Sequence, residues 1–387
     1  MLRNALIFLC LLLLFASNAL ASTLNIGLFT DARPQQVTVS NHWGGYTVFG
    51  DGVELATLED ASAIMAMSVE GSVQLTHHGK VVGTYKRVLV KRKKWGASFR
   101  ISTRTPNRAN RIYKDNLVIA PWGSRLNCIN SVYIEHYLPG VVMAESGDEA
   151  MVEYYKVQSV IARTYALNNR RRHAGEGFNL CDQVHCQVHK GHTYHDSINT
   201  AVKATKSMVL VDPDINLITA SFFSNCGGQT MNSEDVWTKR LSYLRSKPDS
   251  FCQDMPHAHW QKEIPKDEWL RYLARHSNFV PNDSTAVYAA LNYHPEGRET
   301  HFPTTDSALL LKKIRMDFGL RSTHFHIDEK DEEHIVVNCH GFGHGVGLCQ
   351  EGAMCMAEYG HKFNEILHYY YTNVHLIDLS VIDFFRE

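Results

Sequence analysis

Residues 23–118 form a series of short runs in which apolar and polar side chains alternate, with turn-forming residues between the runs. The runs span residues 24–29, 36–40, 46–49, 72–76, 81–85, 87–90 and 99–102. Alternation with a period of two predicts strands that bury one face against a core. We therefore expect a β-rich N-terminal region over residues 22–115.

The middle of the chain changes to helical periodicity. Apolar residues recur at spacings of three and four from Met151 to Thr164, which predicts a helix over residues 149–169. Ser146 and Glu149 have the spacing of a capping box, so we expect Ser146 to begin this helix as its N-cap.

Further short helices and strands follow without a regular alternation of strand and helix. This mixture favours the α+β class over a parallel α/β sheet. The 387 residues are enough for two or three domains. We expect one mixed domain over residues 116–375, with a variable, insert-like segment at 256–330, and a C-terminal tail at 376–387.

The first residues have the pattern of a secretory leader. Arg3 supplies the positive charge, a short apolar run follows, and Ala19-Leu20-Ala21 is a small-residue cleavage site. We expect a signal peptide over residues 1–21, export to a bacterial periplasm or the cell exterior, and no transmembrane segment after cleavage. Eight of the nine cysteines lie beyond the leader, and an oxidising compartment permits them to form disulfides.

The charge balance argues against a nucleic-acid partner. The 39 Lys and Arg residues against 40 Asp and Glu residues give a formal net charge of -1. Such a chain has no bulk positive field to attract phosphates. A composition that is 44% hydrophobic and 20% charged also excludes wholesale disorder.

Glu145 and two cationic residues are the first candidate site. Lys156 and Arg163 are seven residues apart, so they fall on nearly one stripe of the predicted helix that follows Glu145. The three charges can line one side of a cleft, but a solvated stripe with surface ion pairs has the same spacing. A carboxylate at a helix N-terminus is stabilised as the anion. An acid role for Glu145 therefore requires an apolar pocket that raises its pKa.

A dense group of thiols and imidazoles is the second candidate site. Cys181 and Cys186 are flanked by His173 and His185, and such side chains bind tetrahedral zinc. The C-x4-C spacing differs from the C-x2-C of the best-defined zinc motifs. A disulfide between Cys181 and Cys186, or histidines exposed to solvent, accounts for the same residues.

Two glycine-rich segments complete the candidates. The segment 224–230 (Ser-Asn-Cys-Gly-Gly-Gln-Thr) follows a predicted strand, where glycines permit positive φ angles and the close approach of a ligand. The segment 341–353 presents His344 in a loop and Gln350 near the start of a helix. A tight turn and a buried structural histidine are the alternatives. The glycine spacing fits neither the dinucleotide fingerprint nor the P-loop.

Taken in order, these segments resemble the stage II sporulation protein D family, also called the SpoIID/LytB domain family. The matching stretches are residues 137–145 (Tyr-Leu-Pro-Gly-Val-Val-Met-Ala-Glu), 156–166 (Lys-Val-Gln-Ser-Val-Ile-Ala-Arg-Thr-Tyr-Ala), Cys186-Gln-Val with Lys190-Gly191, 224–230 with Asp235-Val-Trp237 and Tyr243-Leu244, and 341–353. Five ordered motifs over roughly residues 115–375 are far more specific than any one of them.

The resemblance implies a catalytic domain with a central substrate cleft. It also implies a lytic transglycosylase that cleaves peptidoglycan glycan strands stripped of their stem peptides. Glu145 occupies the family's catalytic position, as general acid and then general base. One carboxylate suffices because the C6 hydroxyl of the same sugar attacks C1 and forms a 1,6-anhydro product. The implied substrate-binding residues are Lys156, Arg163, Ser224, Gly227, Gly228, His344 and Gln350.

Some members of the family hold zinc near the thiol segment, so the resemblance implies an optional structural zinc that the chemistry does not require. Its implied ligands are His173, Cys181, His185 and Cys186. The family name also covers proteins of another class, non-catalytic enhancers that bind glycan and stimulate a separate peptidoglycan amidase. A zinc hydrolase is less favoured, because thiol-rich sites are structural and closed. Cys349 replaces a common Ser, and Cys355 follows it, which leaves a redox or disulfide role open.

Overall fold

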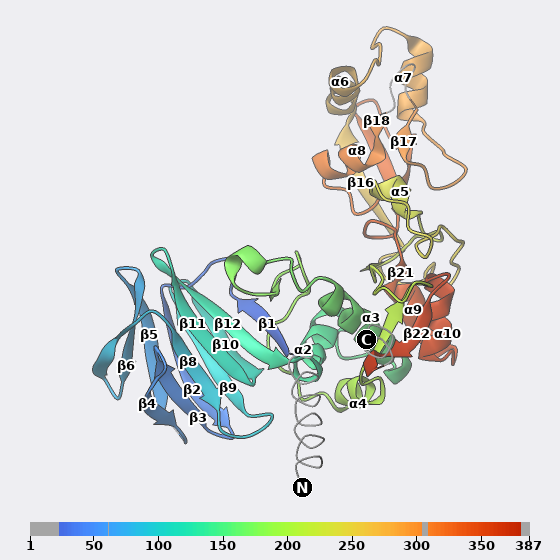
Figure 1. Cartoon of the computed structure of the whole chain (residues 1–387). Coiled ribbons are helices and arrows are strands. Elements are labelled where there is room, and N and C mark those ends of the chain that lie inside the picture. The colour runs from blue at the N-terminus through green and yellow to red at the C-terminus, as the bar shows by residue number, and fades with distance from the viewer. Residues whose placement is uncertain (1–22, 61, 304–308, 381–387) are drawn as a thin grey trace. The chain divides into compact units, whose positions relative to one another are not determined.

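The computed structural model of the chain describes residues 23–60, 62–303 and 309–380 (Figure 1). The predicted signal peptide lies outside these ranges, as does the end of the predicted C-terminal tail. Within them, strands and helices follow one another in irregular order, which confirms the predicted α+β class. No helix in the described ranges has the length and apolar character that a membrane span requires.

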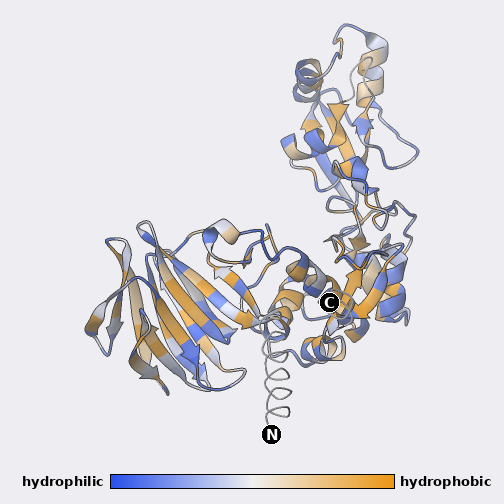
Figure 2. Cartoon of the chain, in the orientation of Figure 1, coloured by the Kyte–Doolittle hydropathy of each residue, from blue (hydrophilic) through white to orange (hydrophobic). Residues whose placement is uncertain are grey.

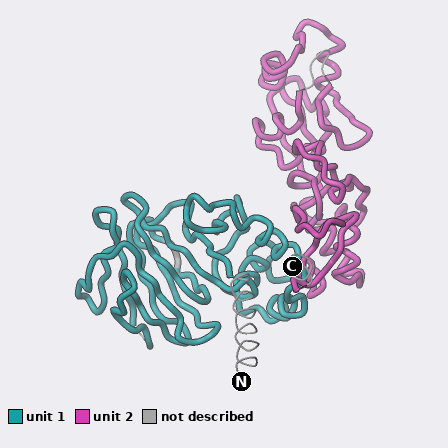
Figure 3. The backbone as a smooth tube through the Cα atoms, viewed as in Figure 1, with its two compact units in different colours: residues 1–149, 158–208 teal, residues 150–157, 209–387 magenta. Residues whose placement is uncertain are grey.

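The chain divides into two compact units (Figure 3). Unit 1 combines residues 1–149 and 158–208, and unit 2 combines residues 150–157 and 209–387. The boundary predicted between residues 115 and 116 lies inside unit 1. The β-rich region and the first family motif therefore belong to one compact unit.

Unit 1 is built on two β-sheets. Its strands are β1 (Thr23–Leu28), β2 (Gln36–Trp43), β3 (Tyr46–Gly50), β4 (Val53–Leu58), β5 (Ala63–Val69), β6 (Ser72–His77), β7 (Lys80–Tyr85), β8 (Val88–Arg92), β9 (Ser98–Arg104), β10 (Asn107–Lys114), β11 (Asn116–Trp122), β12 (Arg125–Tyr133) and β13 (Leu180–Cys181). The seven-stranded sheet has the order β13-β1-β12-β11-β8-β3-β4, and the six-stranded sheet has the order β10-β9-β2-β5-β6-β7.

Alternating side chains explain why these strands form. Val37 and Val39 of β2 and Ile64 and Ala66 of β5 are fully buried, and apolar stripes run along the strands in Figure 2. The seven strand runs predicted from alternation are present as β1 to β3 and β6 to β9. The prediction missed β5 because apolar residues stand at adjacent positions there, which hides the period of two.

Helix α2 (Ile134–Ser146) begins directly after β12 ends, and α3 (Val152–Asn168) and α4 (Asp196–Ala204) follow it along the chain. Helix α2 contains Leu138, Pro139 and Gly140 in its interior, although proline and glycine are unfavourable in a helix. The predicted capping box is wrong. Ser146 is the last residue of α2, where Gly147 ends the helix with a φ of 69°.

Unit 2 contains shorter elements. They are β14 (Met208–Val211), β15 (Phe222–Phe223), α5 (Ser233–Val236), β16 (His259–Pro265), α6 (Lys266–His276), α7 (Ser284–Leu291), β17 (His301–Phe302), β18 (Leu309–Leu310), α8 (Leu311–Asp317), β19 (His324–Glu329), β20 (His334–His340), β21 (Leu348–Cys349), α9 (Gln350–Glu358), α10 (Phe363–Tyr370) and β22 (His375–Asp378). Most of the predicted insert, 256–330, contributes to a hydrophobic core around Trp269, with β16, β20 and β19 as its sheet.

The two glycine-rich segments meet in unit 2. Strand β15 pairs in parallel with β21, so that Phe223 lies opposite Cys349. A side chain at Gly347 is excluded, because its Cβ would lie 2.2 Å from the carbonyl oxygen of Ser221. The close approach of the two backbones therefore explains why glycine is needed there.

Candidate active site and metal-binding clusters

Glu145 lies in the last turn of α2 and is half-buried. Its Oε1 accepts a hydrogen bond from the backbone N–H of Val188 at 3.0 Å. Burial raises the pKa of Glu145, and the Val188 hydrogen bond opposes this shift without cancelling it. A carboxyl group in this position holds its proton to a higher pH than an exposed glutamate does.

The helix end also favours the protonated form. The C-terminal end of a helix carries partial negative charge, which disfavours a carboxylate nearby. From the sequence we expected Glu145 to precede a helix N-terminus, which stabilises the carboxylate and opposes an acid role. In the structure Glu145 lies at a helix C-terminus, so this opposition is absent. Both burial and the position on α2 therefore act in the direction that a general acid requires.

The segment after Cys186 surrounds the glutamate. Val188 donates the bond to Glu145, and Tyr137 donates a hydrogen bond to Oε1 of Gln187 at 3.4 Å. Burial raises the pKa of Tyr137 well above its usual value, and the nearby Glu145 contributes to that shift. A backbone amide carries no signal in the sequence, so Val188 was missed as a partner of the glutamate.

Arg163 is fully buried, which the surface stripe expected from the sequence does not allow. Its guanidinium forms two hydrogen bonds with Glu135, Nε to Oε1 at 2.9 Å and Nη2 to Oε2 at 2.6 Å. A third bond runs from Nη1 to the carbonyl oxygen of Met208 at 3.0 Å. These contacts occupy the guanidinium inside unit 1.

Lys156 belongs to unit 2 and has a different environment. Its Nζ donates a hydrogen bond to Oε1 of Glu153 at 2.6 Å, and the side chain is 22% exposed. The ring of Phe363 lies 5.7 Å from the ammonium group. Lys156 is therefore a partly exposed cation, and it does not share a surface stripe with the buried Arg163.

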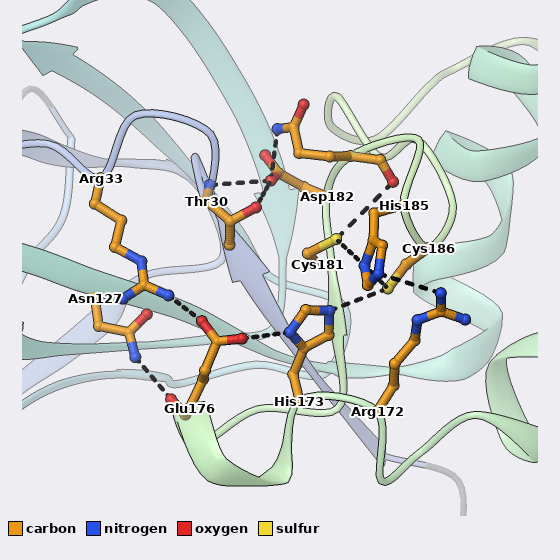
Figure 4. A network of polar contacts seen from close by, with 11 residues as sticks. Thr30, Arg33, Asn127, Arg172, His173, Glu176, Cys181, Asp182, His185 and Cys186 are labelled. Atoms are coloured by element: carbon orange, nitrogen blue, oxygen red, sulfur yellow. Dashed lines mark hydrogen bonds and ion pairs between the residues drawn. The ribbon is translucent and has the colours of Figure 1, made fainter. Parts of the chain in front are cut away.

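The predicted cluster of thiols and imidazoles comes together in unit 1 (Figure 4). One ligand atom from each of the four residues lies within 4.8 Å of all the others. Sγ of Cys186 is 3.4 Å from Nε2 of His173 and 3.8 Å from Nδ1 of His185, and Sγ of Cys181 is 3.9 Å from that Nδ1. Ligand atoms of a tetrahedral zinc site are separated by about 3.5–3.8 Å.

Neighbouring side chains support this cluster. Nδ1 of His173 is hydrogen bonded to Oε1 of Glu176 at 2.5 Å, and Glu176 is paired with Arg33 (Figure 4). A carboxylate behind a ligand histidine is the usual outer partner at zinc sites. Arg172 lies 3.2 Å from Nε2 of His185. If a metal bound Nδ1 of His185, the proton of the imidazole would lie on Nε2. Nε2 and the Arg172 guanidinium would then both be donors, so this contact with the exposed His185 would have to open.

The alternative, a disulfide between Cys181 and Cys186, would require the oxidation of both thiols. The eight described cysteines are all free thiols in the structure, Cys181 and Cys186 included. The thiol of Cys186 is hydrogen bonded to Cys181 and lowers the pKa of Cys181. Two cysteine sulfurs and two imidazoles at these distances fit the four-donor set of a closed structural zinc site.

The two glycine-rich segments bring His344 to a cavity of about 480 Å³ in unit 2. The rings of Phe223 and Trp237 lie 5.3 and 5.4 Å from the imidazole, and Nδ1 accepts a hydrogen bond from Val346 N–H at 3.1 Å. Burial lowers the pKa of His344 to about 4, so the imidazole is neutral at neutral pH.

The other predicted binding residues lie around the same strand pair. Ser224 accepts a backbone hydrogen bond from Glu351 through its carbonyl oxygen, and Gln350 is the first residue of α9. Gly227 and Gly228 have φ angles of 67° and 102°, and Gly227 also borders a cavity of about 420 Å³. These residues and His344 belong to unit 2, whereas Glu145 and Arg163 belong to unit 1.

Comparison with known proteins finds a family model and several bacterial relatives. The family model described as stage II sporulation protein matches residues 123–211. Stage II sporulation protein D of Bacillus subtilis is 27% identical over 71% of this chain and 84% of its own length. An uncharacterized protein of Brachyspira hyodysenteriae is 27% identical over 70% of this chain and 74% of its own.

A relative with another printed role also matches. The amidase enhancer of Bacillus subtilis is 26% identical over 62% of this chain and 40% of its own length. The matched segment 123–211 contains α2, α3 and the cluster of thiols and imidazoles. These matches and the motif order along the rest of the chain support the resemblance to the stage II sporulation protein D (SpoIID) family.

Proposed function

We propose that this protein is an exported lytic transglycosylase of the bacterial cell envelope, which cleaves peptidoglycan glycan strands free of stem peptides. The resemblance to the SpoIID family supports a role at the cell wall. The observation that carries the catalytic part is the half-buried Glu145 at the C-terminal end of α2, with its raised pKa. A carboxyl group that keeps its proton near neutral pH is what a general acid requires.

The reaction needs one carboxyl group in two successive states. Protonated Glu145 gives its proton to the glycosidic oxygen that leaves C1 of the muramic acid. The resulting carboxylate then takes the proton of the C6 hydroxyl of the same sugar, and that oxygen attacks C1. The product carries a 1,6-anhydro ring, no water is consumed, and Glu145 regains its proton.

The N–H of Val188 serves the second state. It donates to Glu145 and stabilises the carboxylate that forms after the first proton transfer. Val188 follows two residues after Cys186, so the cluster of thiols and imidazoles holds the backbone that carries this donor. His173, Cys181, His185 and Cys186 would hold a zinc ion there, and that ion would supply a structural cross-link and no catalytic step.

The cationic residues have separate roles in this proposal. Arg163 positions the start of α2 through its bonds to Glu135, and therefore supports the helix that carries Glu145. Lys156, which is partly exposed, is the candidate to bind the lactyl carboxylate or another polar group of the glycan. Ser224, Gly227, Gly228, His344 and Gln350 remain candidates for contacts with the strand.

A product assay tests the proposal. The purified mature chain is incubated with denuded glycan strands, and the products are analysed by mass spectrometry. Anhydro-ended fragments are expected from the wild type and are expected to fall at least about 100-fold in Glu145→Gln. Glu149→Gln changes an exposed glutamate nearby and is the matched control. Full activity in Glu145→Gln would remove the catalytic assignment.

The second candidate function is that of a non-catalytic enhancer, which the similarity to an amidase enhancer favours. In the same assay, a peptidoglycan amidase is added and stem-peptide release is measured with and without the chain. Unchanged glycan together with faster amidase cleavage, equal in wild type and Glu145→Gln, would establish the enhancer and exclude the transglycosylase.

A further inference from the structure

A second group of metal-type ligands lies in unit 2, within and beside the two glycine-rich segments and apart from the cluster of unit 1. Cys226, Asp249, Cys252 and Cys349 each offer one ligand atom, and these atoms all lie within 4.8 Å of one another. We call these four residues the buried quartet. All four side chains have 0% relative exposure. The motifs drew attention to Cys226 and Cys349 only, because Asp249 and Cys252 belong to no local pattern.

We propose that the buried quartet is a structural site for a thiophilic divalent cation, with zinc as the expected metal. Three thiolates and one carboxylate are a complete tetrahedral ligand set. The ligands come from three separate segments of unit 2: the loop after β15, the segment around residue 250, and the first turn of α9. A metal here therefore cross-links the two glycine-rich segments to a third part of the chain.

The distances favour a metal over a disulfide. Sγ of Cys226 is 3.2 Å from Sγ of Cys252 and 3.3 Å from Oδ2 of Asp249. The sulfur atoms of a tetrahedral zinc site lie about 3.8 Å apart, whereas a disulfide requires about 2.05 Å. The observed separation is nearer to the zinc value. A disulfide between these two thiols would also leave Cys349 and Asp249 in the dry core without a role.

Cys349 is placed as a thiolate ligand. Its Sγ accepts hydrogen bonds from the backbone N–H groups of Cys226 at 3.2 Å and Gly352 at 3.4 Å. Cys349 is also the N-cap of α9, where the partial positive charge of the helix stabilises an anionic sulfur. Two amide donors that converge on one buried sulfur are suited to a charged ligand.

Asp249 is a buried carboxyl group whose direct hydrogen-bond partners are uncharged donors, and the Lys247 ammonium acts on it electrostatically without a direct hydrogen bond among those described. Its Oδ2 accepts from the Tyr370 hydroxyl at 2.8 Å and its Oδ1 accepts from Phe251 N–H at 3.1 Å. A buried carboxylate without a positive group in direct contact is costly, and a metal ion removes that cost.

The neighbourhood is shaped to keep these groups together. A Cβ added at Gly352 would lie 2.2 Å from the Tyr370 hydroxyl and 2.7 Å from Oδ2 of Asp249, so only glycine lets α9 pass this close. Tyr370 thus acts as the outer partner of the carboxylate, in the way that outer residues orient metal ligands.

Metal content measures the proposal directly. The full exported chain, purified without chelator and loaded with zinc alone, is expected to hold about one equivalent in the Cys181→Ser/Cys186→Ser background. Cys252→Ser or Asp249→Ala added to that background is expected to remove it. Cys339→Ser, at a buried thiol of unit 2 outside the quartet, is the matched control and is expected to leave it bound.

A second measurement on the wild type avoids dependence on the folding of variants. Native-state alkylation with peptide mapping is expected to find Cys226, Cys252 and Cys349 protected, and to find all three reactive after a chelator removes the metal. Cobalt in place of zinc is expected to give thiolate charge-transfer absorption. A Cys226–Cys252 cross-linked peptide, or a folded chain with no zinc beyond that of Cys181 and Cys186, would overturn the proposal.

Discussion

Units 1 and 2 both bury carboxylates, but they neutralise them differently. In unit 1, Glu135 is paired with Arg163 at 2.6 Å, and Asp182 with Arg111 at 3.2 Å. In unit 2, Asp249 is surrounded by three thiols and the Tyr370 hydroxyl. A guanidinium neutralises a buried carboxylate by itself, whereas thiols add further negative charge when they ionise. Burial raises the pKa of Asp249, and a cation bound to the buried quartet, as proposed above, would instead hold this carboxyl group as the anion.

The two metal-type clusters differ in the same way. The cluster of unit 1 includes the exposed His185 and lies within one short stretch of chain, between residues 173 and 186. The buried quartet extends from residue 226 to residue 349 and has no exposed member. We expect the first cluster to exchange metal readily and the second to do so only when unit 2 opens.

The largest expected effect tests the ion pair of unit 1. Arg163→Met leaves the carboxylate of Glu135 buried and unpaired, and is expected to lower the free energy of unfolding by about 3–5 kcal/mol. Lys156→Met is the control, because its pair with Glu153 is partly exposed and is expected to contribute about 0.2–1 kcal/mol. Urea unfolding measures both. Equal losses would show that burial does not distinguish the two pairs.

An intermediate effect compares the outer partners of the two clusters. Glu176→Gln weakens the support of His173, and Tyr370→Phe removes the hydroxyl donor to Asp249. Each is expected to lower zinc affinity about 10–100-fold at its own cluster and to leave the other cluster unchanged. Competition with a chromophoric chelator measures the two affinities. A loss at both clusters in either variant would mean that the clusters are not independent.

The smallest expected effect concerns Glu145 and pH. Its pKa is raised in the folded state, so the folded chain favours the protonated form. The resulting stabilisation is fully present below the unfolded pKa and is lost as pH rises through the folded pKa. Glu145→Gln is expected to remove this part of the pH dependence of unfolding, measured by urea titration from acid to neutral pH. Glu149→Gln should retain it, and an unchanged profile in Glu145→Gln would contradict the raised pKa.

Local patterns in the sequence predicted a large part of the fold. The strands β1 to β3 and β6 to β9, helix α3 and the α+β class follow from alternation and helical spacing. The cluster of unit 1 was also predicted, because His173, Cys181, His185 and Cys186 are near one another along the chain. Residues this close in sequence have few ways to lie apart in space.

The surroundings of single side chains were harder to predict. Ser146 and Glu149 have the spacing of a capping box, but Gly147 ends α2 there. Glu145 therefore lies at the C-terminal end of a helix, and not before an N-terminal end as predicted. Arg163 has the spacing of a surface residue, yet Glu135, far away in sequence, gives it a buried partner. Whether a charged side chain is buried depends on its partner. A local sequence pattern does not show a partner that lies on another element.

The sequence by itself determined the ordered family motifs, the position of the candidate acid Glu145 in the chain, and the donors of the first cluster. The tertiary structure decided the protonation tendency of Glu145 and the assembly of the buried quartet from three distant segments. The physical reason is that pKa values and metal sites depend on burial and on distances between atoms, and parallel pairing of β15 with β21 creates distances that no spacing in the sequence encodes.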